Sequence, residues 1–307
     1  MKKTITIGTR GSQLALWQAE YVKKCLNPHF PEIDVSLQII KTTGDRIQNR
    51  SLVGLGKGVF TREIEFALLD GTIDLAVHSM KDLPTQLPAG LCIGAIPSRE
   101  DPRDVLVTAS ELSLEELPEN AKIGTTSPRR RAQLNFLRPD LTVVDVRGNL
   151  DTRLRKLRET EVDGLILAAA GIKRLLGEEV ITEYFEIDRM VPAPGQGALG
   201  IEIREDNDRV RQFLSPINDL DAELAVAAER AVLSRLGGGC QVPIGVHASI
   251  KDSELGIVGM VADRIGARRV VAQDVGASKQ AVCIADRLAT TLLAQGAREL
   301  LGEDDDE

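Results

Sequence analysis

The sequence lacks the features that mark membrane, secreted and metal-binding proteins. No apolar run approaches the ~20 residues of a membrane-spanning helix, and residues 1–8 contain no apolar stretch long enough for a signal peptide. The four cysteines and three histidines are not spaced like metal ligands. We therefore expect a cytoplasmic protein with no membrane contact and no metal site.

Aromatic residues are also scarce, at 3% of the 307 residues, whereas hydrophobic residues make up 43%. The cores must therefore be built from Ala, Val, Ile and Leu, in two or three domains. Cys25, Cys92 and Cys283 lie within helical or strand patterns, so we expect them to be buried and reduced. The sequence contains no Walker A loop and no dinucleotide-binding fingerprint.

Net positive charge is absent as well, since the chain carries a formal charge of −8. This argues against nucleic acid as a partner. Residues 127–158 are an exception, with eight arginines and one lysine against three aspartates. Arginine favours bidentate contacts with carboxylate or phosphate groups, so this block predicts a small anionic ligand.

Several of these arginines follow a recurring arrangement of strand, short polar turn and helix. The strand at residues 4–8 is followed by Arg10 and by Ser12, a typical helix N-cap. The strand at residues 122–124 is followed by Ser127 and then by Arg129 and Arg130. Because a helix N-terminus presents free N–H groups, both turns are predicted anion sites.

Alternation of strand and helix patterns predicts an α/β fold with parallel sheets. We expect a discontinuous first α/β domain at residues 1–98 and 198–216, and a second at residues 99–197, with a cleft between them. Residues 217–307 are predicted to form a small α+β domain with a three-stranded antiparallel sheet. Nothing in the sequence marks an oligomer interface, so we expect a monomer.

Two charged residues follow the predicted strand at residues 73–77. Lys81 and Asp82 lie where ligands bind in parallel sheets, at the carboxyl end of a strand. Asp82 can serve as a general acid or base, or stabilise a cation, and Lys81 can hold a carboxylate. The alternatives are a turn aspartate ahead of Pro84 and a lysine in an ordinary salt bridge.

Three glycines at 237–239 precede Cys240, after a helix predicted at residues 219–236. Gly237 fits a helix C-terminus, and the following glycines leave the thiol on an uncrowded loop. One interpretation is a glycine-rich turn with an inert cysteine, and the other is a thiolate that forms a covalent bond. A second glycine-spaced loop, residues 42–58, is predicted to be a mobile lid.

The sequence resembles the porphobilinogen deaminase family, also called hydroxymethylbilane synthases, over residues 4–245. The similar motifs, in order, are TRGS (9–12), VHSMKDLPT (77–85), GTTSPRRRAQL (124–134), VRGNLDTRL (146–154), PAPGQGAL (192–199) and GGGCQVPIG (237–245). The resemblance implies two domains like those of periplasmic binding proteins, followed by the small C-terminal domain.

The resemblance also implies an activity and its cofactor. The enzyme would be a transferase of tetrapyrrole (haem and chlorophyll-type) biosynthesis that joins four porphobilinogen molecules head to tail, releases ammonia at each step, and frees hydroxymethylbilane by hydrolysis. A dipyrromethane cofactor would be attached to Cys240 through a thioether, and Asp82 would be the catalytic carboxylate. The remaining implied positions are Lys81, Asp82, Ser127, Arg129 and Arg130 for the cofactor, and Arg10, Ser12, Arg147, Arg153 and Arg174 for the substrate.

Two other functions fit parts of the sequence. A non-catalytic, two-lobed module that binds small anions would explain the arginines but has no use for Cys240. A nucleic-acid-binding protein would use the arginine block, against the acidic total.

Overall fold

The computed structural model describes residues 4–46, 60–238 and 242–302. The chain divides into two compact units, Met1–Arg99 with Ala198–Glu223, and Glu100–Gly197 with Leu224–Glu307. Within the described residues, no helix combines the length and the apolar character that crossing a membrane requires.

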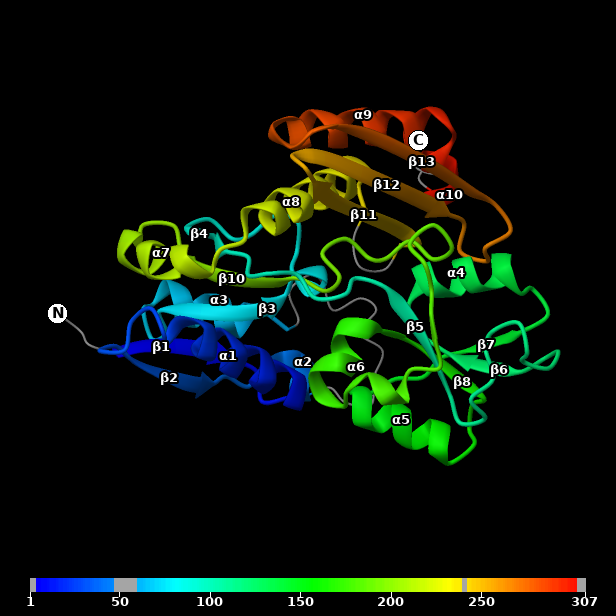
Figure 1. Ribbon diagram of the computed structural model, residues 1–307, viewed down its shortest axis with the longest axis horizontal. Helices are drawn as coiled ribbons and strands as arrows, with labels where there is room; N and C mark the ends of the chain where they lie inside the picture. The colour runs from blue at the N-terminus through cyan, green and yellow to red at the C-terminus, as the bar shows by residue number, and fades with distance from the viewer. Residues whose placement is uncertain (1–3, 47–59, 239–241, 303–307) are drawn as a thin grey trace. The chain divides into compact units, whose positions relative to one another are not determined.

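The first unit is built on a five-stranded sheet with the order β2-β1-β3-β10-β4 (Figure 1). Its strands are β1 (Thr4–Thr9), β2 (Asp34–Ile39), β3 (Leu75–Ser79), β4 (Leu91–Ala95) and β10 (Leu199–Arg204). Its helices are α1 (Gln13–Leu26), α2 (Thr43–Arg46), α3 (Arg62–Leu69) and α7 (Asp208–Leu214), with short 3₁₀ turns η1 (Met80–Asp82) and η3 (Ser215–Ile217). Strands β1, β2 and β3 are parallel, and β10 is antiparallel to both β3 and β4.

Both faces of this sheet are covered because successive strand residues point to opposite sides. Leu75 and Val77 belong to the core that α1 and α7 complete. Ala76, between them, belongs to the core formed with Ile64 and Leu68 of α3. A strand buried on both faces needs a continuous apolar run, as the burial of β3 illustrates.

The second unit contains a sheet of the same pattern, β7-β6-β8-β5-β9. Its strands are β5 (Asp104–Thr108), β6 (Lys122–Gly124), β7 (Thr142–Val144), β8 (Gly164–Ala168) and β9 (Glu183–Tyr184). Helices α4 (Pro128–Leu137), α5 (Leu150–Arg158) and α6 (Ala169–Leu175) follow β6, β7 and β8, and a 3₁₀ turn, η2 (Glu178–Val180), follows α6. Strands β6, β7 and β8 are parallel, whereas β5 is antiparallel to its neighbours.

The same unit includes a three-stranded antiparallel sheet with the order β11-β12-β13. Its elements are α8 (Leu220–Arg235), β11 (Ile244–Lys251), β12 (Glu254–Ala262), β13 (Arg269–Ala277), η4 (Ser278–Gln280), α9 (Ala281–Ala294) and α10 (Ala297–Leu301). Helix α9 lies along the sheet (Figure 1), and its buried Ile284, Leu288 and Leu292 share a core with Val246 of β11.

The predicted fold class is confirmed, with two α/β sheets and a three-stranded antiparallel C-terminal sheet. The expectation of parallel sheets holds for β1, β2 and β3 and for β6, β7 and β8, but not for β5 and β10. The antiparallel strands β5 and β10 each come first after the chain passes from one unit to the other. The three-domain boundaries stay a prediction.

Two further expectations concern the cysteines and the end of α8. The three described cysteines are free, but Cys283 is exposed, and Cys25 and Cys92 are only partly buried, so the prediction of burial is wrong. Cys283 lies on the outer side of α9, away from the residues that pack on the sheet. The helix stop is confirmed, because Gly237 has a left-handed φ of 68° and follows the last turn of α8.

Candidate active site

The predicted site residues of the first unit follow two neighbouring parallel strands. Arg10 and Ser12 come directly after β1, and Lys81 and Asp82 belong to η1, directly after β3. Since β1 and β3 are paired, their carboxyl ends lie at the same edge of the sheet. The four residues are therefore brought to one edge, as the sequence predicted.

Asp82 is exposed between two buried anchors. Met80 and Leu83 are 1% and 3% exposed, and the Met80 N–H donates to the Ala198 carbonyl at 3.0 Å. The Leu83 N–H closes the turn on the Met80 carbonyl at 3.3 Å. The backbone on either side is thus held in the core while the Asp82 carboxylate is open to a ligand.

A buried hydrogen-bonded pair that the sequence did not reveal joins β3 and β10. His78 Nε2 is 3.0 Å from Glu202 Oε2, with the two residues 7% and 0% exposed. Burial, with repulsion from Glu202, raises the pKa of Glu65 of α3, which favours its neutral form beside Glu202. The available signal was a histidine and a glutamate at inner positions of the mainly apolar strands β3 and β10.

Ser12 is the N-cap of α1, as predicted. It has φ −71° and ψ 149°, and its Oγ accepts the Ala15 N–H at 3.3 Å. The other free N–H groups of this first turn form a region of partial positive charge. The turn after β1 is therefore suited to an anion.

Arg10 is held by two partners in the first unit. Its Nη2 lies 2.5 Å from Asp45 Oδ1, and its guanidinium carbon is 4.2 Å from the centre of the Phe60 ring. Burial alone would raise the pKa of Asp45, but hydrogen bonds from Arg10 and Thr42 lower it. The Arg10 side chain is still 28% exposed, so part of it is accessible to a ligand.

The second unit repeats the arrangement at the carboxyl ends of β6, β7 and β8. Ser127 and the two arginines that follow come after β6, Arg147 comes after β7, and Arg174 lies in α6, after β8. Strand β6 pairs in parallel with both of the others, so their carboxyl ends share one sheet edge, whereas Arg174 lies in the last turn of α6. Ser127 is confirmed as the N-cap of α4, with its Oγ accepting the Arg130 N–H at 3.4 Å and Pro128 in the first turn.

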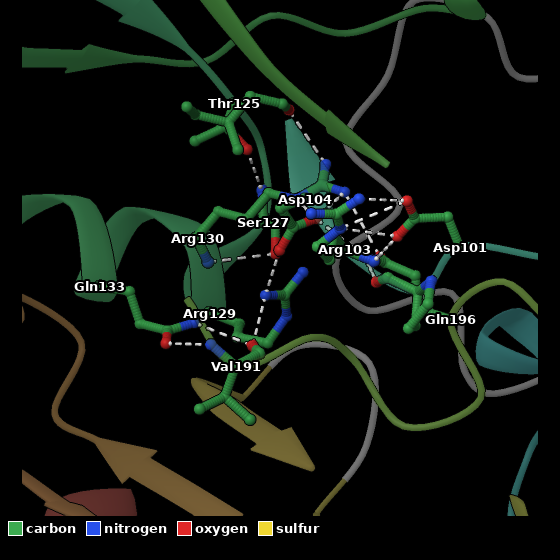
Figure 2. Close-up of polar contacts among 12 residues, drawn as sticks. Asp101, Arg103, Asp104, Thr125, Ser127, Arg129, Arg130, Gln133, Val191 and Gln196 are labelled. Atoms are coloured by element: carbon green, nitrogen blue, oxygen red, sulfur yellow. Dashed lines mark hydrogen bonds and ion pairs between the residues drawn. The ribbon is translucent and has the colours of Figure 1, made fainter. Parts of the chain in front are cut away.

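Arg129 and Arg130 surround one carboxylate, that of Asp104 (Figure 2). Arg129 Nη1 donates to Asp104 Oδ2 at 2.6 Å and to the Val191 carbonyl at 2.7 Å. Arg130 Nε donates to Asp104 Oδ1 at 2.9 Å, and its Nη1 donates to the Ile166 carbonyl at 3.0 Å. The two arginines are 4% and 6% exposed and Asp104 is fully buried, so they are far less accessible than the sequence suggested.

The charges of this cluster do not balance. Burial would raise the pKa of Asp104, but Arg129 and Arg130 hold it far below its usual range, so the carboxylate is ionised. One negative charge then faces two positive ones, and burial lowers the pKa of Arg130. A buried excess of positive charge is costly, and an anionic group at this point would offset it.

Gln196 completes the cluster from the turn at residues 192–197. Its Nε2 donates to Asp104 Oδ1 at 2.9 Å and to the Pro102 carbonyl at 2.7 Å, and its Oε1 accepts from Arg130 Nη2 at 3.4 Å. Sequence reasoning missed both Asp104 and Gln196. The available signal was the pair of arginines itself, since two buried cations need a carboxylate from elsewhere in the chain.

The other predicted arginines are more open. Arg147 is exposed, and Arg153 of α5 is partly buried with its Nε donating to the Gly148 carbonyl at 3.0 Å. Arg174 Nη2 donates to the Gly197 carbonyl at 2.8 Å. Arg155, in contrast, forms a surface pair with Glu159 at 2.8 Å.

Two predicted features lie outside the described residues. Cys240, with Gly239 and Gln241, is one of them. Residues 47–59, which make up most of the predicted lid at 42–58, are the other.

Models of two domains match most of the chain. The model described as "Porphobilinogen deaminase, dipyromethane cofactor binding domain" matches residues 5–212, and "Porphobilinogen deaminase, C-terminal domain" matches residues 223–294. A porphobilinogen deaminase of Syntrophotalea carbinolica is 51% identical over 298 residues, 97% of this chain and 95% of the relative. That of Syntrophomonas wolfei is 49% identical over 98% of this chain and 99% of the relative. Among solved structures, the methionine binding protein MetQ is 15% identical over 75% of this chain and 97% of that chain, with a TM-score of 0.46.

Proposed function

The chain belongs to the porphobilinogen deaminase family, a family of transferases in tetrapyrrole biosynthesis, and we propose which of its residues bind the dipyrromethane cofactor and substrate and which perform the reaction. The activity is the joining of four porphobilinogen molecules, with loss of ammonia at each addition, followed by hydrolysis to hydroxymethylbilane. Neither the family models nor the relatives support the anion-binding module as an alternative.

The observation that carries the proposal is the gathering of cationic groups at the carboxyl edges of both α/β sheets. Dipyrromethane, when bound, supplies the pyrrole carbon to which the first substrate is joined. Its acetate and propionate groups are carboxylates, and Arg129 and Arg130 have one positive charge more than Asp104 neutralises. We assign these two arginines to cofactor binding because a carboxylate would balance that excess. Ser127 and Lys81 are assigned with them because they match the family's motifs at these positions.

Asp82 is the proposed catalytic residue. When porphobilinogen loses ammonia, positive charge develops on its pyrrole nitrogen, and a carboxylate near that nitrogen lowers the free energy of the cation. The same carboxylate can accept the proton that leaves the pyrrole carbon when the new carbon–carbon bond forms. Asp82 is suited to both tasks because its carboxylate is exposed while Met80 and Leu83 fix the backbone around it.

The remaining cationic residues are proposed to hold the substrate and the growing chain. Arg10, Arg147, Arg153 and Arg174 follow strand ends in the two sheets, and Ser12 adds the α1 N-terminus. Each added pyrrole contributes two carboxylates, so several guanidinium groups at different strand ends suit a lengthening anionic product.

Cys240 is the proposed attachment point of the cofactor, through a thioether. Its support is the motif GGGCQVPIG, which lies within the match to the family's C-terminal domain at residues 223–294, and the confirmed end of α8 at Gly237, which leads the chain into this segment. A cytoplasmic location, a monomeric state and the three-domain division are proposed with it. The acidic net charge supports the absence of a nucleic-acid partner.

The test is intact-mass measurement before and after incubation with porphobilinogen. The purified protein is expected to exceed its sequence mass by two linked pyrrole units, and treatment with acid and air should then give a product that absorbs as an oxidised porphyrin. Cys240→Ser should show the bare sequence mass. An unmodified mass in active protein would refute the attachment.

A further inference from the structure

Glu229 is a buried carboxylate to which the proposed reaction gives no role. It lies on α8, whose C-terminus leads towards Cys240, and it is 0% exposed. Its Oε2 accepts the Gly195 N–H at 2.6 Å, and its Oε1 accepts the Ala248 N–H of β11 at 2.7 Å. His247 Nδ1 lies 3.4 Å from the same Oε1. Taking a carboxylate out of water is costly, so this one is retained by specific contacts.

The Gly195 N–H belongs to the turn at residues 192–197, which is held by hydrogen bonds to α8 and β11 and by one within the turn itself. The Val246 N–H donates to the Pro192 carbonyl at 2.9 Å, and the Gln196 N–H donates to the Ala193 carbonyl at 2.9 Å. Gly195 and Gly197 have φ values of 75° and 87°, a conformation that glycine adopts without strain. Because these glycines allow many backbone conformations, hydrogen bonds from outside the turn are needed to fix one of them. Glu229 accepts one of those hydrogen bonds.

The next residue in the turn carries this anchoring to the arginines. Gln196 bonds to Asp104 through its Nε2 and accepts from Arg130 through its Oε1. Figure 2 shows Gln196, Asp104, Arg129 and Arg130 in one connected set of contacts. A continuous series of short contacts therefore links Glu229 to the two arginines, all of it within the second unit.

We propose that Glu229 is a positioning residue for cofactor acquisition, because it fixes the 192–197 turn and thereby the Gln196, Asp104 and Arg130 contacts. This role of Glu229 rests on the proposed function, in which Arg129 and Arg130 bind the cofactor. The residue itself touches neither cofactor nor substrate.

The test compares the fraction of purified protein that carries the two-pyrrole mass in three variants. Glu229→Ala should lower this fraction by about tenfold, since a misplacement of ~1 Å costs a positioned reaction up to roughly 10²-fold. Glu229→Gln keeps one oxygen acceptor and should lose less. Leu288→Ala, in the α9 core and 1% exposed, is the stability control, and it should unfold more easily but keep its cofactor.

Circular dichroism of each variant shows whether it is folded, so that loss of cofactor is not confused with loss of structure. If Glu229→Ala does not fold, Glu229→Gln decides. Full loading of the folded Glu229 variants would overturn the proposal, and so would equal cofactor loss in Leu288→Ala.

A fourth variant separates this inference from the function on which it rests. Arg130→Gln leaves Arg129 and Asp104 as a neutral pair, so the buried charge of the cluster is balanced. If Arg130→Gln loads fully, the assignment of the cofactor site itself is wrong. If Arg130→Gln fails to load and Glu229→Ala loads normally, only the role of Glu229 is wrong.

Discussion

At the scale of single residues, the exposed carboxylate of Asp82 and the buried guanidinium groups of Arg129 and Arg130 suit different tasks. Asp82 is proposed to act in the reaction, and the two arginines are proposed to hold the cofactor. A group that changes its interactions during each addition benefits from exposure, whereas groups that hold a permanent cofactor benefit from fixed geometry. Asp82 is exposed in η1, whereas Arg129 and Arg130 are buried and hydrogen-bonded at the start of α4.

Asp82→Asn is expected to lower kcat by roughly 10²–10⁴-fold, because the amide can neither stabilise the cation as a charge nor accept a proton. The holoenzyme should still bind porphobilinogen, and Asp82→Glu, which keeps the carboxylate, should retain more activity than the amide. Turnover of Asp82→Asn at the wild-type rate would contradict the assignment.

Arg153→Ala is expected to raise KM for porphobilinogen by about tenfold or more, since a charge-assisted hydrogen bond contributes about 1.5–3 kcal/mol. Arg155→Ala is the matched control on the same helix, because its surface pair with Glu159 contributes little. Steady-state kinetics of both variants decide the matter, and equal effects on KM would remove Arg153 from the substrate site.

How far single residues could be predicted depended on the range of their contacts. Ser12 and Ser127 were identified correctly because an N-cap is set by the residues beside it. Asp104 was missed because it meets Arg129 and Arg130 only after the sheet and α4 have formed. Asp82 and Cys240 were singled out by a strand end and a glycine-rich loop, but their roles rested on resemblance, since one carboxylate or one thiol does not reveal its reaction.

At the scale of elements, each candidate cationic group follows a strand end, and the backbone turns there leave little room for change. The turn before β10 is constrained in the same way, as Gly197 shows. It has a φ of 87°, and a Cβ at this position would lie 2.3 Å from the Glu100 carbonyl oxygen. Its own carbonyl accepts from Arg174, so the turn and that arginine are connected.

Gly197→Ala is expected to lower the free energy of unfolding by at least about 1–2 kcal/mol, the cost of a left-handed backbone for a residue with a Cβ, and to raise KM as Arg174 shifts. Gly171→Ala is the control, because a Cβ there meets nothing within 4 Å inside α6, and it should be neutral or stabilise by about 0.5–1 kcal/mol. Urea unfolding measures both, and a Gly197→Ala protein as stable as wild type would show that the turn relaxes freely.

The order of strands and helices was predicted well because apolar periodicity is local, and most bounds differ by only a few residues. Strand direction was not, because β5 and β10 are reversed by the two passages of the chain between units. The sequences of β5 and β10 contain no local signal for the direction in which each strand runs.

At the scale of the whole molecule, the acidic groups with lowered pKa values make the fold dependent on pH. Asp101 and Asp104 are both buried or nearly so, and despite the effect of burial, hydrogen bonds and nearby cations lower their pKa values. A carboxyl whose pKa is lower in the folded state stabilises the fold above the unfolded value of about 3.9. That stabilisation is lost as the pH falls below this value towards the folded pKa.

The free energy of unfolding is therefore expected to fall steeply below about pH 4, as measured by urea titration at several pH values. Asp104→Asn should cost about 3–5 kcal/mol at neutral pH, because it leaves two buried cations without their partner. Its stability should also depend less on acidity than that of the wild type. An unchanged slope between pH 4 and pH 2 would show that Asp104 does not contribute to acid unfolding.

The single tryptophan of the chain, Trp17, stacks on Tyr21 of the same helix, with 5.3 Å between the ring centroids. Because Trp17 lies on α1 of the first unit, its ultraviolet-excited emission reports on the surroundings of that helix, whereas far-ultraviolet ellipticity averages over both units. Thermal unfolding can therefore be followed by tryptophan fluorescence and by circular dichroism without an added dye. Coincident midpoints would indicate a single cooperative transition, and separated midpoints would reveal which half of the polypeptide melts first.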